Sequence, residues 1–279
     1  MNSMAKSESS SRIVTGVVAV ISAVALAVSL IAAGFAACAV PDVSTKALAS
    51  VYSTDDASPF TKDELVAAAV QTKHYTIDDN DKAAAYATIA AINAQEALAG
   101  TAGKGAPKID ATANYAASEL SDEQVAALET AFDAASERYV LTPDAVSHLD
   151  DVFGVVQAAK WWLLAAVVAA CVGCTATAFR GGKRLLGRVL TGAGVSVLAV
   201  FALLAAWVAI DFDGFFAQFH SLFFAAGTWT FSWDSLLICM YPPEFWVGMG
   251  AIWLVVTVAC CVVCITIGRL LRKGSTQKR

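Results

Sequence analysis

Four long stretches of this chain contain only uncharged, mainly apolar residues, and this feature limits the possible folds more than any other. The stretches are 19 to 25 residues long. A helix rises 1.5 Å per residue, so each would measure about 28 Å or more, close to the ~30 Å core of a bilayer. With 57% hydrophobic and 15% charged residues, the chain is neither disordered nor typical of a soluble domain. We predict an all-α integral membrane protein that binds no nucleic acid, with four transmembrane helices at 13–37, 157–179, 189–210 and 245–267.

The charges between these helices are segregated by sign. Residues 1–12, 180–188 and 268–279 together hold eleven of the 19 Lys and Arg residues but a single acid. Residues 38–156 carry 7 basic and 19 acidic residues, and residues 211–244 carry four acids and no base. Short basic segments stay in the cytoplasm. We therefore predict a cytoplasmic tail at each end and a basic cytoplasmic loop, with an acidic domain and an aromatic loop outside.

The first apolar stretch also resembles a signal peptide, because it follows a weakly basic segment and ends near Cys38. A run of 25 residues is long for a signal sequence, and Phe35 is unfavourable three residues before a processed cysteine. We expect an uncleaved membrane anchor.

Helix-capping signals recur through residues 38–156. Thr61–Glu64 and Ser121–Gln124 have the capping-box pattern, and the Asp78–Asp81 run precedes an alanine-rich stretch that we expect to end at Gly100. Pro143, after a threonine, is typical of a first helical position, and this helix is expected to continue into the second span. With no alternating strand pattern present, we predict an extracytoplasmic α-helical cap domain.

The second outer segment is unusually aromatic. Six phenylalanines between 212 and 224 recur at helical spacing and form one apolar stripe. We expect this stripe to lie at the membrane interface, with nearby tryptophans as anchors.

Only three histidines occur, and all lie in the predicted outer segments. His148 would have Asp144 and Asp151 as helical neighbours, and a carboxylate can fix one imidazole tautomer and raise its basicity. His220 lies on the phenylalanine stripe. Each is equally compatible with a structural role: a solvated histidine beside acids, or an interfacial one bonded to a backbone carbonyl. His74 lies in a polar stretch without such a context, and we expect no chemistry there.

Five of the seven cysteines lie near the predicted cytoplasmic ends of the second and fourth spans. We interpret them as small packing residues, although a metal or redox site stays open. They are Cys171, Cys174, Cys260, Cys261 and Cys264.

Two motifs resemble those of a bacterial four-span membrane family that includes the lipoprotein intramolecular transacylases. One is FHSLFFAAGTWTFSWDSLLICMYPPEFW at 219–246, and the other is LTPDAVSHLDDV at 141–152. The resemblance implies a multi-pass protein of the bacterial plasma membrane with both termini in the cytoplasm. It also implies intramolecular transfer of an acyl chain from the diacylglyceryl ester to the N-terminal cysteine amine of a lipoprotein, which leaves a lyso-form.

The resemblance further implies site residues. Its catalytic histidines and acids fall on His148, His220, Asp151 and Asp234. Substrate and membrane lipids would meet an aromatic surface, to which we assign Phe215, Phe219, Phe223 and Trp229.

Acyl transfer between an oxygen and an amine needs a base and a proton donor, so no metal or cofactor is expected. The alternatives are a non-enzymatic membrane protein whose acidic cap binds a partner, and a thiol redox protein. The first has no need of two histidines near the membrane surface, and the second requires the inner cysteines to cluster.

Overall fold

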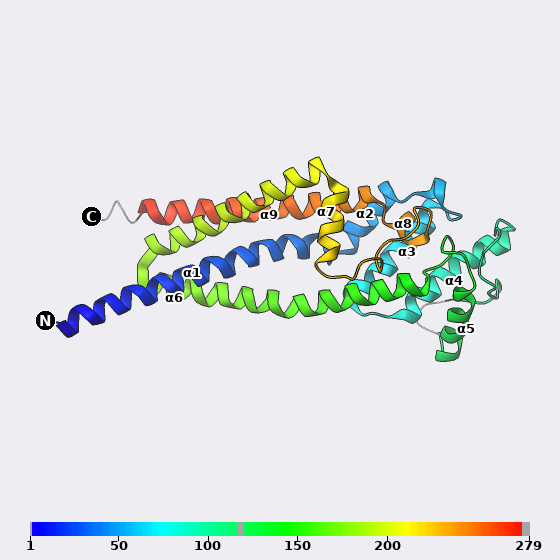
Figure 1. The fold of residues 1–279 in the computed structure, drawn as a ribbon, viewed down its shortest axis with the longest axis horizontal. Helices are drawn as coiled ribbons and strands as arrows, with labels where there is room; N and C mark the ends of the chain where they lie inside the picture. The colour runs from blue at the N-terminus through cyan, green and yellow to red at the C-terminus, as the bar shows by residue number, and fades with distance from the viewer. Residues whose placement is uncertain (1, 116–119, 275–279) are drawn as a thin grey trace. The chain divides into compact units, whose positions relative to one another are not determined.

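The computed structural model describes residues 2–115 and 120–274, with side chains from residue 10 onward (Figure 1). The described part of the chain is helical and contains no strand, as predicted. Of the predicted tails, residue 1 and residues 275–279 lie outside the described residues. The chain forms two compact units. One combines the described parts of 1–37, 158–215 and 252–279, and the other combines those of 38–157 and 216–251.

Three helices are long and apolar enough to cross a membrane: α1 (Asn2–Ala39), α6 (Pro143–Ile210) and α9 (Pro243–Gly274). The sequence predicted four spans. The difference arises in α6, which is 68 residues long and contains two of the apolar stretches. Gly182 interrupts its helical backbone with φ 70° and ψ 179°, and α6 doubles back on itself between its two ends (Figure 1). Only glycine readily adopts such a conformation.

The first unit packs these helices through small and weakly polar residues. Gly187 and Gly268 meet so closely that a Cβ on either would lie 2.5–2.7 Å from the other's carbonyl oxygen. Close approach at small residues is a common way for helices to associate in membranes. On another helix pair, the hydroxyl oxygens of Ser22 and Thr177 lie 3.3 Å apart. Trp253 joins α9 to α1 by donating from Nε1 to the Ile31 carbonyl at 3.0 Å.

The second unit consists of short helices together with the ends of the long ones. Its complete elements are α2 (Asp42–Tyr52), η1 (Asp55–Ala57), α3 (Lys62–Lys73), the π-helix η2 (His74–Asp78), α4 (Lys82–Ala99), α5 (Asp122–Asp133) and α8 (Leu236–Met240). The helix α7 (Phe212–Ser221) continues into it from the first unit.

The predicted helix signals in this unit are confirmed. Both capping boxes form, at the starts of α3 and α5. Asp81 caps α4 by accepting from Ala84 N at 3.0 Å, and Gly100 ends it with φ 74°. The helix α6 begins at Pro143 and continues into the second apolar stretch. The π-helix at His74–Asp78 and the end of α7 at Ser221, before the last two phenylalanines of the stripe, were not predicted.

The core of the second unit holds the segment before α9 firmly. Phe60, Tyr75, Phe132, Met240 and Phe245 are among its largest buried side chains. Ser53 Oγ donates to the Met240 carbonyl at 3.1 Å, and the Tyr241 hydroxyl donates to the Ala69 carbonyl. These long-range bonds fix the chain that follows the aromatic loop.

Candidate active site

The second unit brings two histidines together. The ring centroids of His148 and His220 lie 6.2 Å apart, and their planes are nearly parallel, at 30°. The two residues are 72 positions apart in sequence and belong to different helices, α6 and α7. The fold thus brings together the two histidines on which the resemblance placed the catalytic histidines.

His148 is placed by the first two turns of α6. One face of these turns is buried and carries Ala145, Val146, His148 and Leu149. The Thr142 hydroxyl caps the helix by accepting from Ala145 N at 3.4 Å. The imidazole is only 8% exposed, and its Nδ1 has no hydrogen-bond partner within the described part of the protein. His148 is therefore an aromatic core residue with an unpaired polar atom.

The tautomer of His220 is set by its own helix. Its Nδ1 lies 2.9 Å from the carbonyl oxygen of Phe216, one turn earlier in α7. A carbonyl oxygen only accepts, so Nδ1 must carry the proton and donate. In the neutral ring, Nε2 then holds the lone pair. The geometry thus gives His220 one nitrogen that can act as a base.

Aromatic rings surround both imidazoles. Phe224 and Phe231 lie 4.8 and 5.8 Å from the His148 ring centroid. Phe216 and Trp229 lie 4.0 and 4.8 Å from the His220 ring, and Phe219 lies 5.9 Å from it. Sequence reasoning assigned Trp229 and Phe219 to the site but not the other three. Phe216 was detectable from its position four residues before His220, whereas Phe231 lies on an irregular segment without a periodic signal.

This surrounding keeps both histidines neutral near pH 7. Burial, together with a smaller effect of the neighbouring His220, lowers the pKa of His148 to about 4, and the charge of Asp151 partly opposes this. Burial also lowers the pKa of His220, against the raising effect of the hydrogen bond to Phe216. A low-polarity environment disfavours the charged imidazolium. The pair therefore offers basic nitrogens rather than positive charge.

The expectation that Asp144 or Asp151 accepts a hydrogen bond from His148 is wrong for the described side chains. Both acids are exposed, whereas His148 is buried in the core of the second unit. Asp151 acts on His148 only through its charge. Its neighbour Asp150 instead accepts from the Tyr75 hydroxyl at 2.5 Å and from Asn80 Nδ2 at 3.2 Å.

Three further residues proposed for the site do not contact either histidine ring in a described pair. Asp234 forms an ion pair with Arg138, at 3.3 Å between Oδ2 and Nε. Phe215 belongs to the first unit and contacts Trp207, with ring centroids 5.4 Å apart. Phe223 packs on Phe219 at 5.3 Å and is 48% exposed. Of these three, Phe223 extends the aromatic surface that begins at Phe219.

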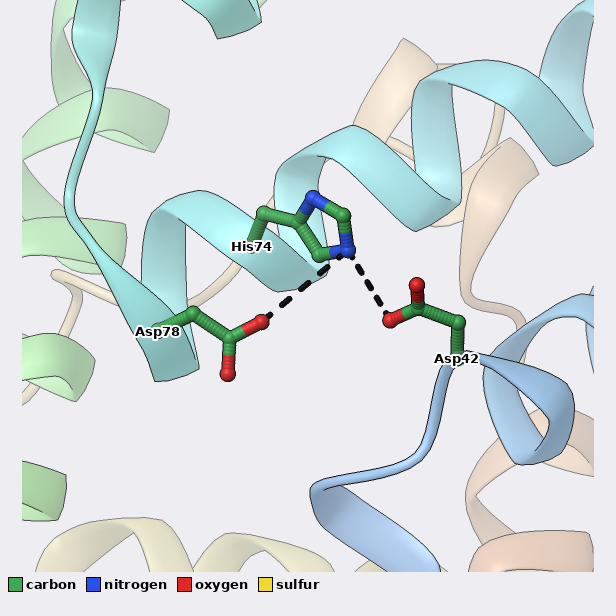
Figure 2. A group of neighbouring side chains, drawn as sticks. All are labelled: Asp42, His74 and Asp78. Carbon is green, nitrogen blue, oxygen red and sulfur yellow. Dashed lines mark hydrogen bonds and ion pairs between the residues drawn. The ribbon is translucent and has the colours of Figure 1, made fainter.

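His74 has acidic neighbours that the sequence did not predict (Figure 2). Its Nε2 lies 2.9 Å from Asp42 Oδ1 and 3.9 Å from Asp78 Oδ2. The three ligand-type atoms lie within 4.8 Å of one another. The buried Lys73 already places its ammonium 3.0 Å from Asp42 and 2.8 Å from Asp78. This group is therefore an ion-pair cluster in which lysine supplies the cation.

Replacing Lys73 by methionine should destabilise the protein. Its Nζ also donates to the Val40 carbonyl at 2.6 Å, so three contacts would be lost. Charged hydrogen bonds are worth about 1.5–3 kcal/mol each, but the half-exposed acids can regain water. We expect a net loss of about 2 kcal/mol, measured as a lower thermal midpoint in detergent. Lys82→Met is the control, because its exposed pair with Glu129 should contribute under about 1 kcal/mol. Equal midpoints for the two variants would contradict the interpretation.

The five cysteines near the ends of the second and fourth predicted spans belong to no group of described side chains with the geometry to hold a metal ion. Within the described residues, Asp42, His74 and Asp78 form the one group of His, Cys, Asp and Glu with suitable geometry. No disulfide joins the described cysteines. Cys261 is fully buried and packs with Leu30, Val197 and Phe201. This supports the interpretation of these thiols as packing residues.

Comparisons with known proteins identify the family and the fold. The model of the family "Lipoprotein intramolecular transacylase Lit" matches residues 13–246. The chain is similar to a solved structure of the membrane integral transacylase Lit from Bacillus cereus, with a TM-score of 0.61 and 15% identity, over 95% of this chain and 98% of that one. A histidine-to-alanine variant of that enzyme gives a TM-score of 0.60 at 15% identity, over 99% and 100% of the chains. A search of curated proteins found no match.

The helical membrane fold and the family match define this protein's class as an integral membrane acyltransferase. Because the family model covers most of the sequence, the chain belongs to the lipoprotein intramolecular transacylase family, Lit. The function predicted from the sequence, transacylation of a bacterial lipoprotein, is confirmed at this level.

Proposed function

We propose that this transacylase acts on lipoproteins whose N-terminal cysteine carries diacylglycerol, and that His148 and His220 form its catalytic pair. The observation that carries the proposal is the pair itself: two neutral imidazoles with ring centroids 6.2 Å apart, in an aromatic surrounding. Such a surrounding suits acyl chains, and the third histidine of the sequence, His74, belongs to the ion-pair cluster with Asp42. No metal or organic cofactor is needed for this chemistry.

The proposed reaction uses the free nitrogen of His220. The α-amine nitrogen attacks the carbonyl carbon of the sn-2 ester, and the new N–C bond forms as the bond from that carbon to the glyceryl oxygen breaks. His220 Nε2 takes the proton that the nitrogen loses and returns it to the glyceryl oxygen. His148 contacts the departing oxygen through its unpartnered Nδ1. Asp151 and Asp234 then act indirectly, through charge and through the ion pair with Arg138.

Positioning contributes to the rate in this proposal. Ester and amine belong to one substrate molecule, so the step is unimolecular and avoids much of the entropy cost of bringing two reactants together. Phe219, Phe223 and Trp229 line the aromatic surface on which the acyl chains would lie. Their role is to orient the lipid, with the ester near the imidazoles.

The proposal is tested by mass spectrometry of lipoprotein N-termini. Membranes that contain this protein should convert a diacylglyceryl lipopeptide into the lyso-form, with one acyl chain on the amine. Membranes without the protein should leave it unchanged. A lipopeptide whose amine is blocked by acetylation is the matched control, since it keeps the ester but cannot accept the acyl chain. Identical spectra with and without the protein would favour the partner-binding alternative for the acidic cap.

For the membrane topology we propose four spans, at 13–37, 157–179, 189–210 and 245–267, in a bacterial plasma membrane. The interruption of the helical backbone at Gly182 supports a division of α6 into two spans. The basic loop around it supports a cytoplasmic location for this turn and for both termini.

Reporter fusions should verify this topology. A phosphatase reporter that is active only outside the cytoplasm should be inactive when joined after residue 184 and active when joined after residue 110. We expect this pattern of reporter activity because basic residues are in excess in the segments proposed to be cytoplasmic. The opposite pattern at either position would refute the proposed orientation.

A further inference from the structure

A second polar atom beside the histidine pair lacks a partner. In the described part of the chain, four buried side-chain nitrogen or oxygen atoms have no hydrogen-bond partner, and two of them are His148 Nδ1 and Trp229 Nε1. Buried polar groups in native proteins are nearly always paired, so each exception calls for an explanation. These two lie on rings that flank the same residue, since His148 and Trp229 are 6.2 and 4.8 Å from His220.

The indole nitrogen can only donate a hydrogen bond, so it requires an acceptor. The Trp229 ring lies beside those of His220 and Phe216, with ring centroids 4.8 and 6.3 Å apart. The phenyl ring has no acceptor atom, and Nδ1 of His220 donates to the Phe216 carbonyl. Nε2 of His220 has a lone pair but is not hydrogen-bonded to the indole nitrogen. The acceptor that suits this position is a carbonyl oxygen brought by a ligand.

We propose that Trp229 donates from Nε1 to the carbonyl oxygen of the acyl group in transfer. This inference rests on the proposed function. As the amine attacks the carbonyl carbon, that oxygen takes up negative charge, and a preplaced N–H in a dry aromatic site stabilises it. The charge returns to the carbonyl when the bond to the glyceryl oxygen breaks. Trp229 thus supplies the oxyanion contact, while His220 moves the proton.

The test compares two tryptophan-to-phenylalanine variants in an assay with purified full-length protein and a synthetic diacylglyceryl lipopeptide in micelles. Trp229→Phe keeps an aromatic ring but removes the N–H. Loss of one oxyanion donor typically reduces kcat by about 10²–10³-fold, so we expect this decrease with little change in KM. Trp233→Phe is the control, because Trp233 is 74% exposed and lies on the same segment, and its kcat should match that of the wild type.

Two further measurements separate this role from a structural one. Trp229→Phe should keep its thermal midpoint, because it removes a buried donor that has no partner in the protein. It should also bind a phosphonate analogue of the tetrahedral intermediate at least tenfold more weakly than the wild type, with unchanged binding of the lyso-product. A kcat within threefold of the wild type, or a decrease explained by unfolded protein, would overturn the inference. A wild-type protein that forms no lyso-product would instead overturn the proposed function.

Discussion

Replacing His220 by alanine should lower the rate of lyso-lipoprotein formation by about 10²–10⁴-fold, the usual contribution of a general acid–base group. The proposed base is Nε2, and no other nitrogen in the ring's surroundings can replace it, because His148 lies 6.2 Å away and its pKa is also lowered. His148→Ala should cause a decrease in the same range. The rate is measured by mass spectrometry of a purified lipopeptide over time.

Two variants make this result specific. His220→Asn retains an amide N–H that can donate to the Phe216 carbonyl, as Nδ1 does now, but it has no basic nitrogen. It should fold normally and be as inactive as the alanine variant. His74→Ala should keep its activity per folded molecule, because His74 belongs to the ion-pair cluster with Asp42. A rate for His220→Asn within tenfold of the wild type would show that the ring serves structure and not proton transfer.

The second large effect that we expect is on the titration of His148. Its pKa of about 4 means that the ring is still about 90% neutral at pH 5, where an imidazole with the ordinary pKa of 6.5 is only about 3% neutral. With only three histidines in the chain, NMR of isotope-labelled imidazoles can follow each ring. His220→Gln should raise the pKa of His148, since the neighbouring ring contributes to lowering it.

The same shift links stability to pH. The unfolded chain takes up a proton on His148 near pH 6.5, whereas the folded chain does so only near pH 4. The free energy of unfolding should therefore decrease as the pH falls from 6.5 to 4 and stay constant above 6.5. His148→Phe should weaken this dependence. Titration of His148 near pH 6.5 in the folded wild type would contradict the burial on which the proposed site depends.

The helix ends show which parts of the fold can be predicted from short stretches of sequence. The capping boxes at Thr61 and Ser121, the Asp81 cap and the Gly100 terminus were all predicted from a few neighbouring residues, and all are present. Such signals depend on backbone geometry within one turn, so the rest of the fold cannot change them easily. Asp144 and Asp151 show what such local signals cannot predict. Their helical spacing placed them near the His148 ring, but it could not tell which face of α6 would be buried.

The sequence alone determined the helical membrane class, the expected charge asymmetry and the identity of the two histidines, because hydropathy, charge and local motifs are properties of short segments. The tertiary structure decided which distant side chains meet. It brings His148 to His220, pairs Asp234 with Arg138, and sets His74 beside Asp42. These contacts join residues 32 to 96 positions apart, and no local periodicity encodes them. They form only when the core packs and fixes which face of each helix is buried.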